Sequence, residues 1–81
     1  MVDKSLLKSW FNEGKNLGKL GKYEDAIKCF DEAIKIDPNY ALAWYSKGTV
    51  LENLRRYKEA KICYNKVKRT MSSNMKKEFS L

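Results

Sequence analysis

The stretch WYSKGTVLENLRRYKEA, residues 44–60, follows the same pattern as WFNEGKNLGKLGKYEDA, residues 10–26. The two stretches lie 34 residues apart, and both begin with tryptophan and end with alanine. The shift of 34 residues aligns Trp10 with Trp44, Gly14 with Gly48, Leu17 with Leu51, Leu20 with Leu54, Tyr23 with Tyr57, Ala26 with Ala60, Cys29 with Cys63, and Phe30 with Tyr64. A constant period of this length indicates a repeat architecture, in which neighbouring units bury each other's apolar faces. The chain is therefore predicted to hold two copies of one structural unit.

Within each unit, the spacing of apolar residues predicts two antiparallel helices joined by a short turn. Trp10, Gly14 and Leu17 are spaced i, i+4, i+7, so they share one face of a helix. Gly21 suits the left-handed conformation that ends many helices. Pro38 ends the second helix of the first unit, because the residue before a proline is pushed out of the α region. We expect an all-α fold with helices over residues 4–20, 23–36, 40–54 and 57–70.

The 34-residue period and these residues resemble the tetratricopeptide repeat, or TPR, from residue 7 to about residue 70. The matching residues are Trp10, Gly14, Leu17, Tyr23, Ala26, Phe30, Ala33 and Pro38 in the first unit, and Trp44, Gly48, Leu51, Tyr57, Ala60 and Tyr64 in the second. The resemblance implies two helix-turn-helix units in a short right-handed α-solenoid. It also implies a single TPR domain over residues 1–81, with repeat 1 over about 7–40, repeat 2 over about 41–74, and a C-terminal tail or helix extension over 71–81.

The two glycines that align at the 34-residue shift are predicted to be points of close packing. Gly14 and Gly48 have no Cβ atom, so we expect the paired helix to approach them closely through the small residues Ala26 and Ala60.

The second unit departs from the family pattern near its turn and its end. Arg55 takes the place of the turn glycine, and a left-handed conformation there would cost arginine roughly 1–2 kcal/mol. Val67 replaces the usual small residue, and Ser72 replaces the usual proline. In the first helices, Glu13 and Lys47 stand where the family usually has leucine. The second repeat is thus least typical where a third would begin.

The C-terminal residues allow three interpretations. Residues 71–81 can turn at Ser72-Ser73 and fold back as a short helical cap, or the fourth helix can continue without interruption. In the second case, one apolar stripe would comprise Tyr64, Val67, Met71, Met75 and Phe79. A second copy of the chain would cover this stripe, so we expect a homo-oligomer, either a simple dimer or one that exchanges helices. In the third interpretation, the chain is a fragment of a longer array.

The resemblance implies that the first helix of each repeat lines a concave binding face. The residues on the face free of the core are predicted to be Lys8, Phe11, Lys15, Lys19, Leu42, Tyr45, Thr49 and Asn53. Lysines beside aromatic side chains suit a peptide with acidic and apolar residues. The alternative is that these are ordinary surface residues. The carboxylate clamp of some family members is not expected, because Phe11, Lys15 and Ser46 stand at its positions.

Composition argues against most other classes of function. The chain has no histidine, which removes the commonest general base and a common zinc ligand, and it has no phosphate-binding loop. We therefore expect no enzyme activity, no cofactor and no metal. Cys29 and Cys63 are expected to be reduced, since equivalent points on packed helices lie roughly 8–10 Å apart and a disulfide spans at most about 7 Å between Cα atoms.

The net charge of +7 is concentrated in residues 41–81. This basic half favours a solvated surface or an acidic partner, and a nucleic-acid-binding accessory protein is the alternative function. The chain has neither a signal peptide nor an apolar run that could span a bilayer, so a cytoplasmic protein is expected. The preferred interpretation is a non-enzymatic interaction or scaffold module that binds a protein or peptide partner, self-associates, or does both.

Overall fold

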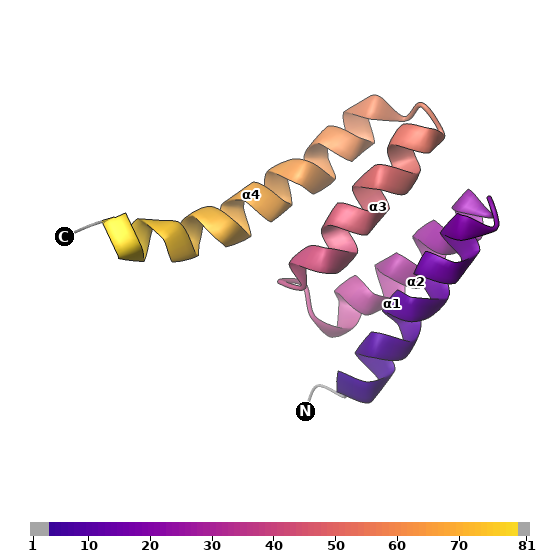
Figure 1. Ribbon diagram of the computed structural model, residues 1–81, viewed down its shortest axis with the longest axis horizontal. Helices are drawn as coiled ribbons and strands as arrows, with labels where there is room; N and C mark the ends of the chain where they lie inside the picture. The colour runs from indigo at the N-terminus through magenta and orange to yellow at the C-terminus, as the bar shows by residue number, and fades with distance from the viewer. Residues whose placement is uncertain (1–3, 80–81) are drawn as a thin grey trace.

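A computed structural model describes the backbone of residues 4–79 and the side chains of residues 4–70. Within residues 4–79 the chain forms four helices and no strand: α1 (Lys4–Lys19), α2 (Tyr23–Ile36), α3 (Ala41–Asn53) and α4 (Tyr57–Phe79). The helices pack as two pairs, α1 with α2 and α3 with α4, and α2 contacts α3 (Figure 1). The all-α fold predicted from the sequence is confirmed.

The two turns inside the repeats have the same backbone geometry. Gly21 has φ 79° and Arg55 has φ 61°, so both residues are left-handed. The amide of Lys22 donates to the Leu17 carbonyl at 2.9 Å, and the amide of Arg56 donates to the Leu51 carbonyl at 2.8 Å. These bonds close the helix ends as in a Schellman motif. The left-handed arginine predicted from the 34-residue alignment is confirmed.

The substitution Arg55→Gly is expected to raise the free energy of unfolding by about 0.5–1 kcal/mol. It removes the cost of a left-handed side chain, about 1–2 kcal/mol, and part of this gain is offset by the greater freedom of glycine in the unfolded chain. Urea denaturation followed by circular dichroism measures the change. As a control, Gly21→Ala places a Cβ atom at the equivalent turn, where nothing lies within 4 Å, so its expected loss comes from the backbone alone. A loss of stability in Arg55→Gly would contradict the strain argument.

The closest packing within each repeat joins a glycine to an aromatic ring. A Cβ atom at Gly14 would lie 2.6 Å from Phe30 Cε1, and one at Gly48 would lie 2.7 Å from Tyr64 Cε1. The predicted close approach of the paired helix is confirmed, and the atoms nearest to each glycine belong to the aromatic residue one turn after Ala26 or Ala60. Ala26 is itself fully buried.

The two repeats are joined through α2 and α3. Lys47 Nζ lies 2.6 Å from Asp31 Oδ1, and Arg56 Nη1 lies 3.2 Å from Glu24 Oε1. The Trp44 indole donates to the carbonyl of the proline that ends repeat 1, at 2.8 Å. The shared core includes Leu7, Phe11, Ala26, Ile27, Phe30, Ala33, Ala43, Val50, Leu51, Ala60 and Cys63. A single core therefore runs through both repeats.

The last helix is longer than predicted. The other helix ends differ from the predicted ones by at most one residue, whereas α4 continues to Phe79 instead of ending at residue 70. Of the predicted conformations of the C-terminal residues, the structure therefore has the continuous helix and not a separate cap (Figure 1). The side chains of Met71, Met75 and Phe79, three members of the predicted stripe, lie outside the described ones.

Candidate functional site

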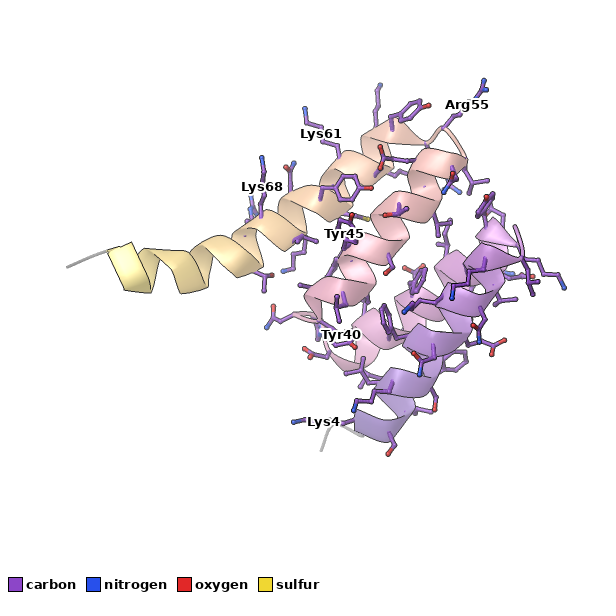
Figure 2. All side chains as sticks on the ribbon, viewed as in Figure 1. Lys4, Tyr40, Tyr45, Arg55, Lys61 and Lys68 are labelled. Atoms are coloured by element: carbon purple, nitrogen blue, oxygen red, sulfur yellow. The ribbon has the colours of Figure 1, made fainter. Side chains whose placement is uncertain are left out.

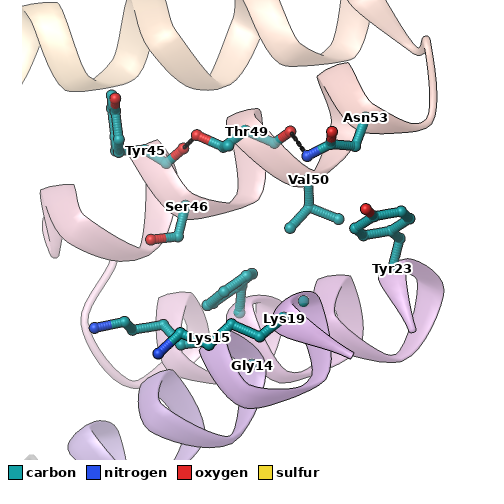
Figure 3. Close-up of a pocket in the computed structure, with 11 residues that line it drawn as sticks. Gly14, Lys15, Lys19, Tyr23, Tyr45, Ser46, Thr49, Val50 and Asn53 are labelled. Carbon is teal, nitrogen blue, oxygen red and sulfur yellow. Dashed lines mark hydrogen bonds between the residues drawn. The ribbon is translucent and has the colours of Figure 1, made fainter. Parts of the chain in front are cut away.

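A groove of about 310 Å³ lies between α1 and α3, and α2 supplies its floor (Figure 3). We call it the α1–α3 groove. It is lined by Gly14, Lys15, Gly18, Lys19, Tyr23, Phe30, Tyr45, Ser46, Thr49, Val50 and Asn53. The close-up shows Ser46 and Val50 pointing from α3 toward α1, with the two lysines on the opposite wall.

The α1 wall combines two ammonium groups with two positions that have no side chain. Lys15 Nζ lies 5.4 Å from the centroid of the Phe11 ring, a cation–π distance. Gly18 leaves the backbone of α1 open to a ligand, whereas the Phe30 ring covers Gly14. No acidic residue is among those that line the groove. The groove therefore presents positive charge beside an apolar floor.

The α3 wall is polar, and its groups are held by bonds within the helix. The Thr49 hydroxyl donates to the Tyr45 carbonyl at 3.1 Å, and the Asn53 amide donates to the Thr49 carbonyl at 3.1 Å. Tyr45 is 56% exposed, and its ring packs against that of Tyr64 with a centroid distance of 5.8 Å. Burial, followed by a hydrogen bond donated to Glu52, raises the pKa of the Tyr64 phenol. These side chains form a fixed surface of hydroxyl, amide and ring edge.

Two family models match the chain. A TPR repeat model matches residues 14–54, and a tetratricopeptide repeat model matches residues 41–69. The chain belongs to the tetratricopeptide repeat family. The resemblance inferred from the sequence is thereby confirmed for both repeats, whose helices form the two pairs seen in the structure. No curated protein matches the chain.

Five of the eight residues predicted on the binding face of the TPR line the α1–α3 groove: Lys15, Lys19, Tyr45, Thr49 and Asn53. Lys8 and Leu42 are exposed but lie outside it. Phe11 was placed on a face free of the core, and that placement was wrong. Its side chain is 9% exposed, and its ring packs against Phe30 at 6.0 Å and Tyr40 at 5.4 Å.

Sequence reasoning missed several residues that line the groove of this TPR protein. Ser46 and Val50 lie one turn apart on the side of α3 that faces α1, and Gly18 lies one turn after Gly14 on the side of α1 that faces α3. Their i, i+4 spacing was available in the sequence. The prediction considered the exposed face of each helix separately. These residues can be identified only when it is known that α1 and α3 face each other across the groove.

The predicted self-association stripe is partly occupied within the monomer. The Tyr64 ring lies against Gly48, and its hydroxyl donates to Glu52. Val67 is half-buried. Tyr64 therefore contributes to the fold of repeat 2, and the remaining three members of the stripe lie outside the described side chains.

The two cysteines and the described acidic side chains lie outside the α1–α3 groove. Cys29 and Cys63 are both free and buried, as predicted, and burial raises the pKa of each thiol. The described residues contain no group of three acidic or cysteine side chains that could hold a metal ion. None of the helices within residues 4–79 has the length and apolar character needed to cross a membrane.

Proposed function

We propose that this TPR chain is a non-enzymatic interaction module that binds an acidic peptide segment of a partner protein in the α1–α3 groove. TPR repeats are typical of protein–protein interaction modules and are typically non-catalytic. The observation that supports the peptide is the pairing of Lys15 and Lys19 with an apolar floor in a groove without acidic lining residues. Lysines attract and orient an acidic segment, while apolar pockets hold its anchor side chains.

The volume of the groove limits how much of a peptide it can hold. A volume of about 310 Å³ is at the lower end of that of ligand pockets. This space holds one or two apolar side chains, which would contact Tyr23 and Val50, while flanking carboxylates reach the two lysines. The hydroxyl and amide groups of α3 can bind the peptide backbone on the opposite side.

Reversing the charge of the groove tests this proposal. The variant Lys15→Glu/Lys19→Glu is expected to bind a fluorescent peptide of Asp and Glu residues around a single leucine at least about tenfold more weakly, a loss of about 1.4 kcal/mol. Fluorescence anisotropy at physiological salt measures the affinity. The matched control, Lys58→Glu/Lys61→Glu, makes the same charge change on exposed positions of α4 and is expected to bind as the unaltered chain does.

A substitution that fills the groove without changing its charge tests whether the peptide binds in the groove itself. A Cβ atom at Gly18 would meet only Val50, at 3.7 Å, so Gly18→Leu places a side chain in the groove while the helix is retained. It is expected to weaken peptide binding without a change of charge. Equal losses in the groove and control variants, or tighter and strongly salt-dependent binding of an oligonucleotide, would contradict the proposal and favour the nucleic-acid alternative.

Self-association through α4 is a second candidate function, and it remains a prediction. It is favoured by the length of α4, which has 23 residues where α2 has 14 and extends beyond the other helices (Figure 1). Light scattering on the same variants reports it independently of the peptide. The groove substitutions are expected to leave the oligomeric state unchanged, because they lie on α1.

A further inference from the structure

Leucines at equivalent positions of the two repeats are buried to very different extents. Leu51 is 1% exposed, whereas its counterpart Leu17 is only partly buried. Leu54 is partly buried, whereas its counterpart Leu20 is 71% exposed. The difference arises because α3 packs against α2 of the other repeat, whereas α1 follows no described helix. Repeat 1 therefore leaves exposed an apolar surface whose counterpart in repeat 2 is buried against α2. We call it the N-terminal face, and it comprises Trp10, Glu13, Leu17, Leu20 and Lys22.

The contact between the two repeats indicates what such a face binds. Ile27 of α2 is 9% exposed and belongs to the core that both repeats share. On either side of it along α2, Glu24 pairs with Arg56 at 3.2 Å and Asp31 pairs with Lys47 at 2.6 Å. The face of α2 that receives repeat 2 thus carries an acid, an aliphatic residue three positions later, and a second acid four positions after that.

The N-terminal face has the same arrangement with one charge reversed. Glu13 stands where repeat 2 has Lys47, whereas Lys22 keeps the positive charge of Arg56. We propose that this face binds a helix of a partner protein that carries an acid, an aliphatic residue three positions later, and a base four positions after that. In this complex the acid faces Lys22, the base faces Glu13, and the aliphatic residue covers the exposed leucines. The proposal uses none of the residues that line the α1–α3 groove, so it stands apart from peptide binding there.

A second copy of this chain does not fit the face in this register. At the positions equivalent to the acid, the aliphatic residue and the second acid of α2, α4 has Lys58, Lys61 and Asn65, and all three are exposed. Lys61 and Lys68 project away from the other helices on the outer side of α4 (Figure 2). Stacking one copy on another would place Lys58 against Lys22 and a lysine against the leucines. The partner is therefore a different helix, with the complementary charges.

Grafting the pattern onto α4 tests the proposal on the intact protein. The variant K58E/K61I/N65K changes three exposed residues, so the fold is expected to be retained. It presents the proposed partner helix, already folded, to the N-terminal face of a second copy. Sedimentation velocity over a range of concentrations is expected to show head-to-tail association at least about tenfold stronger than that of the unaltered chain.

A matched variant separates charge recognition from simple adhesion of the new isoleucine. K58E/K61I/N65D differs only in the sign of the charge that faces Glu13, and it is expected to associate about fivefold to tenfold more weakly than K58E/K61I/N65K. Adding E13K to the N65D variant is expected to restore the stronger association. Any association through the C-terminal stripe is common to all the variants. Equal association of the N65K and N65D variants, or none above that of the unaltered chain, would overturn the proposal.

Discussion

Replacing Gly14 with leucine is expected to abolish the folded state at room temperature. A Cβ atom at this position would lie 2.6 Å from Phe30 Cε1 and 2.8 Å from Cδ1. The Phe30 side chain is 1% exposed, so its ring has no free space into which to turn. The overlap is expected to cost about 4 kcal/mol or more. At about 0.05–0.15 kcal/mol per residue, a chain of 81 residues has only about 4–12 kcal/mol of stability in total.

Loss of the helical signal in circular dichroism would report this unfolding, and alanine provides a graded comparison. Gly14→Ala and Gly18→Ala make the same chemical change one turn apart on α1, with the same gain in helix propensity of about 1 kcal/mol. At Gly18 the added atom lies 3.7 Å from Val50, so stability is expected to rise by about 0.5–1 kcal/mol. At Gly14 it is expected to fall by about 1–3 kcal/mol. Equal effects of the two alanines would contradict the packing argument.

The features that the sequence predicted well are those that depend on local geometry. The left-handed backbone conformation of Arg55 could be predicted from its alignment with Gly21. Both turns are closed by backbone hydrogen bonds to carbonyls three and five positions earlier, so they require the same conformation. Helix ends were predicted within one residue for the same reason, except at α4. The family pattern places a proline near residue 72, but this chain has Ser72 there. The helix therefore continues past the predicted end at residue 70.

The features that were predicted poorly depend on contacts between distant segments. A stripe of residues identifies a face of one helix, but it does not say which neighbour covers that face. Phe11 shares a face with Lys15, yet it is buried because Tyr40 and Phe30 lie against it. Val50 likewise lines the groove because of a distant segment, since α1 lies opposite it.

Replacing Leu51 with alanine is expected to lower the free energy of unfolding by about 3–5 kcal/mol, near the upper end of the range for buried leucines. Leu51 is 1% exposed and belongs to the core that joins the two repeats, so its removal leaves a cavity that rigid helices on both sides cannot close. Urea denaturation by circular dichroism measures the loss. Leu17→Ala is the matched control, because it makes the same change at the equivalent position of repeat 1.

The control is expected to cost only about 1–2 kcal/mol, because Leu17 is already partly exposed and less apolar surface returns to water when it is truncated. Both residues are leucines in the same helical position, so helix propensity and the unfolded chain contribute nearly equally to both variants. The difference between them therefore measures what stacking on a neighbouring helix contributes at this position. A helix bound to the N-terminal face would remove that difference, since it would bury Leu17 as α2 buries Leu51. Equal losses in the free protein would mean that the N-terminal face is already covered, and the exposed leucines could not then serve as a binding surface.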